Sequence, residues 1–422
     1  MLKVFYNFLI NFFYLPYLII IFYRKIQNKE HEIKFKEKIF PKSIVRPQGF
    51  LFWFHAASIG ELNTIFPIVD FFLKKDKKYT FLITTVTLSS YNLFVKKYGN
   101  DERIYHQFLP YDSNFLIQNF FKNWRPNIVS FVDSEIWPNF FFKIKKEGLP
   151  LVLLNARLTK KTFKRWKILK SFATEILSSI KLSICSNKET LNYLNHFNGK
   201  NIKYFGNIKY CSTLQNIYSG NNIKNDLDKN TKIWCAISTH PGEEIFCGEV
   251  HQILRKYFKN VKTIIIPRHI NRINKISDSL NKMGLRTQIK NENDKIEKNS
   301  EIILINYYGS VLKYYENFKQ IFIGKSLIKK LEKDGGQNPI DAAKMGCFIF
   351  HGPYVSNFKE IYEYLNSQNI SSKIDSKNIL AEKLINNFNS ALSTNNNKTV
   401  KLNKYSEEIF DKVIKEYENI II

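Results

Sequence analysis

Two short polar stretches, each directly after an apolar run, hold residue types suited to proton transfer and anion binding. They are Phe54-His55-Ala56-Ala57-Ser58-Ile59-Gly60-Glu61 and Ser238-Thr239-His240-Pro241-Gly242-Glu243-Glu244. Parallel strands of doubly wound domains deliver polar groups to the carboxyl edge of the sheet, where ligands bind. Two such edges in one chain predict two sheet domains facing a cleft, and they favour an enzyme.

Glu61 is the sharpest candidate for a chemical role. It follows Gly60, which permits a tight turn between a strand and the next helix. A carboxylate at this edge can accept a proton from a substrate hydroxyl. It can equally cap the helix and be stabilised by the helix dipole. Spacing alone leaves both interpretations open.

Two further strand ends in the first half carry charge. Glu135, in Asp133-Ser134-Glu135-Ile136-Trp137-Pro138-Asn139, is expected to face the same crevice as Glu61. The alternative for Glu135 is a structural acid in a salt bridge. Arg157 ends a third strand, where it serves either as a phosphate contact or as a partner for Glu135.

The second half offers two candidate anion sites. Arg268 and His269 follow a strand and are placed to reach a nucleotide phosphate; the alternative is a basic dipeptide on the surface. Residues 334–341 form a diglycine turn leading into a helix, whose free N–H groups bind anions. A diglycine turn alone is weak support for such a site.

The composition limits the possible partners. The net charge of +27 calls for anionic partners such as nucleic acid, lipid head groups or phosphorylated substrates, although a compositional bias toward Lys explains the excess equally well. The five cysteines form no Cys-x-x-Cys pair and the histidines show no metal-ligand spacing, so no metal site is expected. The chain lacks a Gly-x-x-x-x-Gly-Lys-Ser/Thr loop and a Gly-x-Gly-x-x-Gly turn after the first strand, which argues against ATPases and Rossmann dehydrogenases.

The amino terminus is predicted to attach the protein to a membrane. Residues 1–23 are almost wholly apolar and aromatic, with Lys3 the only charge, and the stretch is long enough to cross a bilayer; Arg24, Lys25 and Lys29 follow it. The basic flank predicts that the domains lie on the cytoplasmic side of the membrane. A helix lying in the membrane interface is the alternative, because the segment contains Pro16 and several Tyr and Asn residues.

Strand-like and helix-like runs alternate along the rest of the chain, which predicts an α/β fold with parallel sheets. The expected strands are residues 50–55, 80–85, 127–132, 151–155, 181–186, 232–237, 261–266, 301–305, 319–323 and 347–350. Helices are expected at 139–147, 162–178 and 404–417. The predicted parts are an anchor (1–24), a basic tether (25–48), a first domain (49–215), a linker (216–230), a second domain (231–385) and a polar segment with a final helix (386–422).

Taken together, the motifs resemble those of the 3-deoxy-D-manno-octulosonic acid (Kdo) transferase family. The resemblance covers about residues 2–360 in family order. The matching pieces are His55-Ala56-Ala57-Ser58-Ile59-Gly60-Glu61, Leu109-Pro110-Tyr111-Asp112, Ser134-Glu135-Ile136-Trp137-Pro138-Asn139, Asn155-Ala156-Arg157-Leu158, Gly206-Asn207-Ile208-Lys209, Ser238-Thr239-His240-Pro241-Gly242-Glu243-Glu244, Pro267-Arg268-His269 and Gly335-Gly336-Gln337-Asn338-Pro339-Ile340-Asp341.

The resemblance implies a GT-B glycosyltransferase of family 30: two Rossmann-like domains, an acceptor site in the first and a CMP-sugar site in the second. Such enzymes move Kdo from CMP-Kdo onto a lipid A precursor (lipid IVA) with inversion and without a metal. By motif, Glu61 corresponds to the catalytic base, and Glu135 and Lys209 to groups that support the transition state. The residues that correspond to the CMP-binding segments are Arg268, His269, Gly309, Ser310, Val311, Asn338, Pro339, Ile340 and Asp341.

The chain departs from the family pattern at three places. Gln337 and Asp341 stand where the family usually has His and Glu, and Gly309-Ser310-Val311 stands where Gly-Glu-Leu is common. The implied partners are CMP-Kdo, the lipid A precursor and inner-membrane lipids, with no nucleic acid. Two other hypotheses are a GT-B transferase that uses a UDP-sugar on a lipid, and a basic membrane or nucleic-acid-binding protein without catalysis.

Overall fold

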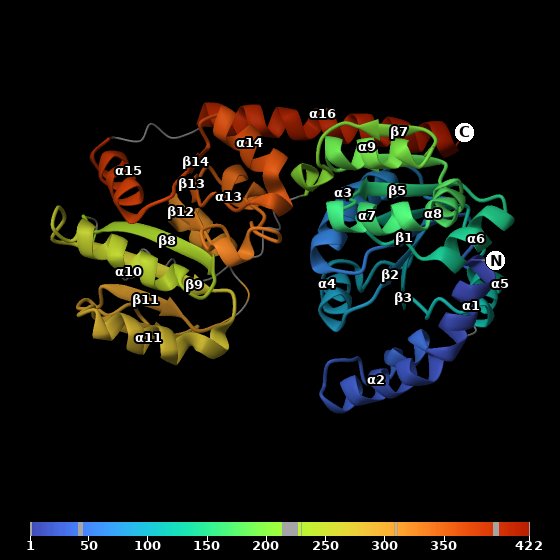
Figure 1. Ribbon diagram of the computed structural model, residues 1–422, viewed down its shortest axis with the longest axis horizontal. Coiled ribbons are helices and arrows are strands. Elements are labelled where there is room, and N and C mark those ends of the chain that lie inside the picture. The colour runs from blue at the N-terminus through green and yellow to red at the C-terminus, as the bar shows by residue number, and fades with distance from the viewer. Residues whose placement is uncertain are drawn as a thin grey trace. The chain divides into compact units, whose positions relative to one another are not determined.

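The computed structural model describes residues 2–40, 45–212, 227–228, 230–307, 309, 311–390 and 396–421. The chain divides into two compact units, Met1–Thr213 with Ser406–Ile422, and Leu214–Tyr405. Each unit is built on a parallel sheet (Figure 1). The predicted linker lies outside the described residues apart from 227, 228 and 230, and so do residues 391–395 of the predicted polar segment.

Among the described residues, the first unit holds a seven-stranded parallel sheet in the order β3-β2-β1-β4-β5-β6-β7. The strand order reverses between β1 and β4, which pair from Phe52↔Ile128 to His55↔Phe131. Such a switch point is where ligands bind in doubly wound sheets. The strands are β1 (Phe50–His55), β2 (Tyr79–Thr85), β3 (Ile104–Phe108), β4 (Ile128–Val132), β5 (Leu151–Ala156), β6 (Leu182–Cys185) and β7 (Ile202–Tyr204).

Most helices of the first unit begin at a polar cap directly after a strand. The hydroxyl or amide oxygens of Ser58, Thr87, Ser113, Thr159 and Asn187 each accept a backbone N–H of the first turn, which satisfies donors that lack an intrahelical partner. The helices are α3 (Ile59–Lys75), α4 (Leu88–Tyr98), α5 (Asn114–Trp124), α6 (Pro138–Lys146), α7 (Lys160–Ile168), α8 (Lys170–Leu177) and α9 (Lys188–His196).

The amino-terminal segment forms two helices, α1 (Leu2–Phe12) and α2 (Tyr14–Ile26), separated by a bend of 43°. Within the described residues, neither helix alone has the length and apolar character to cross a bilayer, whereas the bent pair taken together has both. The single spanning helix expected from the sequence is therefore replaced by a broken pair, since the chain bends at Phe13.

The segment predicted as a basic tether is partly folded onto the first unit. Phe35 and Ile39 are buried, and the backbone N–H of Phe108 donates to the carboxylate of Glu37 at 2.9 Å. Lys38 is also buried and pairs with Glu30. Residues 30–39 of the predicted basic tether are therefore packed on the first unit through apolar side chains and this buried ion pair.

The second unit is also a doubly wound α/β unit, but its strand order differs from that of the first. Its described residues form a seven-stranded parallel sheet in the order β10-β11-β9-β8-β12-β13-β14, with the switch point between β8 and β12. The strands are β8 (Lys232–Thr239), β9 (Val261–Pro267), β10 (Thr287–Lys290), β11 (Ile302–Ile305), β12 (Gln320–Ile323), β13 (Phe348–His351) and β14 (Ser371–Lys373). The helices are α10 (Glu243–Leu254), α11 (Ile273–Lys282), α12 (Val311–Asn317), α13 (Ile340–Lys344), α14 (Lys359–Ser367) and α15 (Lys377–Asn389).

The predicted fold class is confirmed: the chain contains two parallel sheets flanked by helices, and each predicted strand is present. The four strands that the sequence did not reveal are β3, β7, β10 and β14. Each is a short strand at the edge of its sheet, and its residues are only partly buried. The helix predicted over 162–178 is two helices, α7 and α8, because the backbone leaves the helical region at Leu169.

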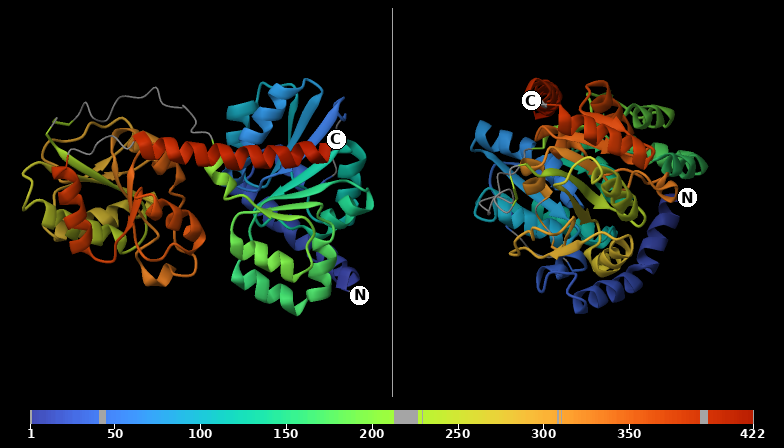
Figure 2. Two further views of the ribbon diagram at one scale, coloured as in Figure 1. Left: turned by 90° about the horizontal axis from the view of Figure 1, so that it is seen from above. Right: turned by 90° about the vertical axis from the view of Figure 1, so that its left-hand side faces the viewer.

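The last helix, α16 (Asn396–Ile421), begins in the second unit and ends in the first. Figure 2 shows this helix in red. In the first unit it packs against α3, where the ring centroids of Phe410 and Phe71 are 6.0 Å apart. Tyr417 is fully buried there, close to the rings of Phe54 and Phe72, and its hydroxyl is 2.8 Å from that of Ser130. The first unit is therefore completed by the carboxyl end of the chain.

We expect Tyr417→Ala to lower the free energy of unfolding by about 3–5 kcal/mol, the usual cost of removing a large buried aromatic side chain. Denaturant unfolding followed by circular dichroism measures the change. Lys412→Ala removes an exposed side chain from the same helix and serves as the matched control. Equal effects of the two substitutions would contradict the packing described here.

Candidate functional site

Glu61 lies in the first turn of α3, directly after the end of β1. Its carboxylate accepts the backbone N–H of Ala57 at 2.7 Å and the hydroxyl of Ser58 at 2.8 Å, while the N–H of Glu61 donates to the Ser58 hydroxyl oxygen at 3.4 Å. This reciprocal pattern is a variant of the capping box, in which the carboxylate accepts the N–H of Ala57 in place of that of the N-cap residue Ser58. Glu61 therefore caps helix α3, which is one of the two interpretations of the sequence. The same hydrogen bonds hold its carboxylate at the edge of the sheet where chemistry is expected.

The surroundings of Glu61 favour its neutral form. Burial, followed by the negative charge of Asp133 and that of Glu135, raises the pKa of Glu61 to about 7, although the Ser58 hydroxyl and the Ala57 N–H oppose this shift. A carboxylate with a pKa near the working pH is suited to general base catalysis. The structure therefore brings Glu61 and Glu135 into electrostatic contact at the β1/β4 switch point.

Glu135 has the opposite character. The indole N–H of Trp137 donates to its Oε2 atom at 2.8 Å, and the same oxygen is 3.4 Å from Nε2 of His55. Burial opposes ionisation, but the hydrogen bonds from His55 and Trp137 and the attraction of His55 lower the pKa of Glu135 below its ordinary value. Two neighbouring carboxylates whose pKa values are pushed apart are typical of active sites.

Asp133 connects this pair to Lys209. Its Oδ2 atom accepts from Nζ of Lys209 at 2.8 Å, and its Oδ1 atom accepts from the side-chain amide of Asn155 at 2.5 Å. Asp133 and Asn155 end β4 and β5, and both have left-handed backbones, with φ of 55° and 53°. Strained backbone of this kind is concentrated at functional sites.

The sequence did not single out Asp133, although it predicted Glu135 two residues later. The signal was present, since Asp133 is the first residue after β4 and every strand end at the carboxyl edge is a candidate. Lys209, which the sequence predicted as a supporting group, lies beside Asp133 rather than directly on a glutamate. Arg157 donates its backbone N–H to the carbonyl oxygen of Asp133 at 3.1 Å.

In the second unit, the carboxyl ends of β8, β9 and β11 line a pocket of about 140 Å³. It brings together Arg268, Gly309 and Val311 of the predicted donor site with Tyr307 and Tyr314. The two tyrosine hydroxyls are 2.7 Å apart. The predicted site residue Ser310 lies outside the described residues.

Positive charge gathers at the β8/β12 switch point. Burial, then Lys325, His269, Arg268 and Arg272, lowers the pKa of His240 to about 4. Arg268 and His269 are exposed, so an anion can reach both side chains. Exposed cations gathered at one edge of a sheet attract anions.

Glu243 and Glu244, at the start of α10, have structural roles. The Glu243 carboxylate accepts the backbone N–H groups of His240, Lys325, Ser326 and Leu327 at 2.8–3.0 Å, which fixes the loop after β12. Glu244 accepts two hydrogen bonds of 3.1 Å from the guanidinium group of Arg272. Both acids hold the cationic edge in place.

The diglycine turn that precedes the predicted segment 338–341 is tied to the loop after β12. The N–H of Gly336 donates to the carbonyl oxygen of Lys325 at 2.6 Å. Pro339 and Ile340 are buried, so only their backbone is available to a ligand. Asn338 accepts the N–H of Ile340 at 3.1 Å, and burial raises the pKa of Asp341. The following helix, α13, has five residues, so its dipole contributes less to an anion site than the sequence led us to expect.

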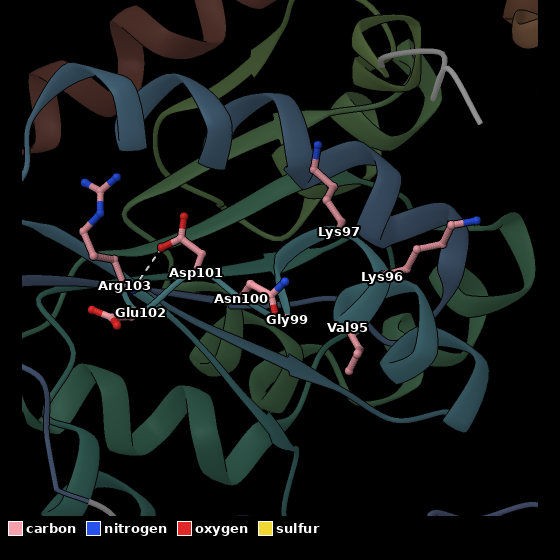
Figure 3. A pocket seen from close by; sticks show the side chains of 8 residues that line it. All are labelled: Val95, Lys96, Lys97, Gly99, Asn100, Asp101, Glu102 and Arg103. Carbon is pink, nitrogen blue, oxygen red and sulfur yellow. Dashed lines mark hydrogen bonds between the residues drawn. The ribbon is translucent and has the colours of Figure 1, made fainter. Parts of the chain in front are cut away.

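Within the described residues, no group of three or more His, Cys, Asp or Glu side chains has the arrangement of a metal site. A second hollow, of about 620 Å³, lies around the end of α4 and the loop to β3 (Figure 3). Its charged side chains are of both signs and include Lys97, which pairs with Asp70. This hollow precedes β3 and so lies at the opposite edge of the sheet from Glu61.

Comparison with solved structures defines the class of protein. The chain is similar to a putative UDP-N-acetylglucosamine 2-epimerase from Listeria monocytogenes (TM-score 0.60, 12% identity, 88% of this chain and 97% of that one). It is also similar to a glycosyltransferase from Rickettsia africae ESF-5 (TM-score 0.55, 12% identity, 89% and 99%). These likenesses show the fold, which is the GT-B architecture of glycosyltransferases.

The sequence comparisons specify the family. A family model described as 3-deoxy-D-manno-octulosonic-acid transferase (kdotransferase) matches residues 30–212. The probable 3-deoxy-D-manno-octulosonic acid transferase, mitochondrial, of Arabidopsis thaliana is 30% identical over 373 residues (84% of this chain, 82% of that protein), and the 3-deoxy-D-manno-octulosonic acid transferase of Rickettsia bellii is 29% identical over 420 residues (98% and 97%). The chain belongs to the Kdo transferase family and is a glycosyltransferase.

The raised pKa of Glu61 has a consequence for stability. Because the folded protein holds this pKa at about 7 rather than 4.5, ionisation of Glu61 destabilises the fold as the pH rises through this interval, and the cost is complete above it. Glu61→Gln stays neutral. We expect it to raise the free energy of unfolding relative to the wild type at about pH 8 and to lose this advantage below about pH 5.

Urea denaturation at several pH values measures the effect of Glu61→Gln. The control is Glu175→Gln, which neutralises an exposed glutamate of α8. A difference between wild type and Glu61→Gln that does not vary with pH would show that the charge of Glu61 carries no such cost.

Proposed function

We propose that this enzyme transfers Kdo from CMP-Kdo to a lipid A precursor, lipid IVA, with inversion at the anomeric carbon. The observation that carries the proposal is the Glu61 carboxylate, fixed by a capping box at the β1/β4 switch point with a pKa of about 7. Membership of the Kdo transferase family indicates that Kdo is the transferred sugar. The acceptor and the donor are proposed from the resemblance of the motifs.

In the proposed reaction, Glu61 takes the proton of an acceptor hydroxyl while the hydroxyl oxygen attacks the anomeric carbon of Kdo. A new C–O bond forms there, the bond from that carbon to the CMP phosphate oxygen breaks, and the electron pair leaves with CMP. Attack from the side opposite the leaving group gives inversion. Glu135, kept ionised by His55 and Trp137, and the ammonium group of Lys209 supply fixed charges near the reacting groups.

The donor nucleotide is proposed to bind at the cationic edge of the second unit. Arg268 and His269 are exposed at the end of β9, and Lys325 follows β12. These cations offset the charge that develops on the departing phosphate, so the proposed mechanism assigns no step to a divalent ion. The pocket beside Arg268 and Tyr307 has room for part of the nucleotide.

The amino-terminal helices are proposed to attach the enzyme to the cytoplasmic face of the bacterial inner membrane. They expose a set of large apolar side chains, a composition that favours partition into lipid. The most exposed of these are Val4 (72%), Phe8 (64%), Phe12 (64%), Leu15 (65%), Ile19 (64%) and Ile26 (79%). Attachment keeps the enzyme beside an acceptor that is itself insoluble in water.

We expect Glu61→Gln to lower kcat by roughly 10²–10⁴-fold, the usual contribution of a general base, and to leave the dissociation constant for CMP-Kdo nearly unchanged. The assay is mass spectrometry of the lipid product formed from lipid IVA with CMP-Kdo or, in parallel, with UDP-sugars. Turnover by the wild type with UDP-sugars alone would reject the proposed donor. An equal loss of donor binding and turnover in Glu61→Gln would reject the role of Glu61.

We expect Arg268→Ala to weaken CMP binding by roughly ten- to a hundredfold, because it removes a cation that hydrogen-bonds to phosphate. Isothermal titration calorimetry with CMP measures this. Lys256→Ala removes the same charge from an exposed position at the end of the neighbouring helix α10 and controls for net charge. If both substitutions weaken CMP binding equally, Arg268 has no specific contact with the nucleotide.

A further inference from the structure

Asp112 is a fully buried carboxylate that joins two distant parts of the first unit. Its Oδ2 atom accepts the hydroxyl of Tyr6 at 2.7 Å and the backbone N–H of Asn139 at 3.1 Å, and its Oδ1 atom accepts the N–H of Phe140 at 3.1 Å. The side-chain amide of Asn139 returns to the carbonyl oxygen of Asp112 at 2.7 Å. A residue of the amino-terminal helix α1 thus shares one carboxylate with the first turn of α6.

Asp112 takes the place of a local cap for α6. The residue at the N-cap position, Trp137, makes no capping hydrogen bond with its side chain. The free N–H groups of the first turn are satisfied by Asp112 instead, from a different loop. The position at which α6 begins therefore depends on Asp112 and on what holds Asp112.

The beginning of α6 in turn sets the active-site loop. Trp137 immediately precedes the first residue of α6, and its indole N–H donates to Glu135 at 2.8 Å. The Oε2 atom of Glu135 also lies 3.4 Å from Nε2 of His55, and the negative charge of Glu135 contributes to the raised pKa of Glu61. A continuous series of hydrogen bonds and one short stretch of chain thus leads from Tyr6 to Glu135.

Helix α1 is docked on this region at several points (Figure 1). The Tyr111 hydroxyl donates to the carbonyl oxygen of Ile10 at 3.1 Å, and the ring of Tyr6 lies 5.9 Å from that of Phe172. The ammonium group of Lys3 is 4.3 Å from the ring centre of Phe142, which belongs to α6 itself. The helix that is proposed to enter the membrane is therefore also packed against the element that orients Glu135.

We infer that Tyr6 is a positioning residue for the transfer reaction, acting through Asp112 and the start of α6 on Trp137 and Glu135. The inference rests on the proposed function, which gives Glu135 its role near the transition state. Without the Tyr6 hydroxyl, a buried carboxylate loses one of its donors, and the first turn of α6 is held less firmly. The amino-terminal helix is then part of the catalytic apparatus as well as a means of membrane attachment.

The test compares Tyr6→Phe with Tyr14→Phe in the full-length enzyme. Both substitutions remove one hydroxyl from the amino-terminal helices, but that of Tyr14 donates to the carbonyl oxygen of Ile39 and does not contact Asp112. Steady-state rates are measured with detergent-dispersed lipid IVA and CMP-Kdo, together with donor binding by calorimetry and vesicle flotation.

We expect Tyr6→Phe to lower kcat by roughly three- to tenfold, the effect of losing one hydrogen bond to a buried carboxyl group. Donor binding and flotation should be unchanged, and Tyr14→Phe should keep the wild-type kcat. A second comparison uses Trp137→Phe, which removes the indole N–H that donates to Glu135. If both residues act through one path, the double variant should lose less than the product of the single losses.

The outcomes separate this inference from the proposed function. If wild-type enzyme makes no Kdo-lipid product from CMP-Kdo, the proposed function is wrong. If the wild type is active but Tyr6→Phe keeps the same kcat, or if the losses of Tyr6→Phe and Trp137→Phe multiply, the positioning role is wrong. A parallel fall in the fraction of protein that binds CMP-Kdo would show misfolding and would also overturn the positioning role of Tyr6.

Discussion

The concentration of negative charge at the β1/β4 switch point is the constraint on which the first unit depends. Glu61, Asp133 and Glu135 lie close enough to affect one another, in surroundings that are largely removed from water. Like charges in such a place are tolerated only when donors compensate them. The compensating groups lie at or after the ends of three strands, β1, β5 and β7. They include the N–H of Ala57, the imidazole of His55, the amide of Asn155 and the ammonium group of Lys209.

The two units use the same kind of doubly wound sheet for opposite electrostatic purposes, although their strand orders differ. Both sheets have seven described strands and a central reversal of strand order. At the first reversal the chain places carboxylates, and at the second it places Arg268, His269 and Lys325. The sheet supplies the location, whereas the residues that follow each strand decide the chemistry. This division suits a reaction that needs a base for one substrate and cations for the other.

The amino-terminal segment combines an exposed apolar face with specific packing against the first unit. Its outer face carries exposed aromatic and aliphatic side chains, whereas Tyr6, Phe35, Ile39 and the Glu30–Lys38 pair face the first unit. A buried ion pair and a buried tyrosine hydroxyl are geometrically demanding, because an unmatched partner is costly. The packing of this segment against the first unit is therefore specific. A segment held by apolar contacts alone would not require these polar pairs.

The amino-acid sequence determined the strand runs, the polar turns after them and the apolar amino terminus, because buried parallel strands and strongly apolar helices carry clear local patterns of hydrophobicity. It also pointed to Glu61, Glu135 and Arg268 through their positions after strands. Only the tertiary structure decided that Glu61 titrates near neutrality, that Lys209 pairs with Asp133, and that Tyr6 reaches Asp112 across 106 residues. These properties arise from side chains that are distant in sequence and meet in a low-dielectric interior, so no local pattern records them.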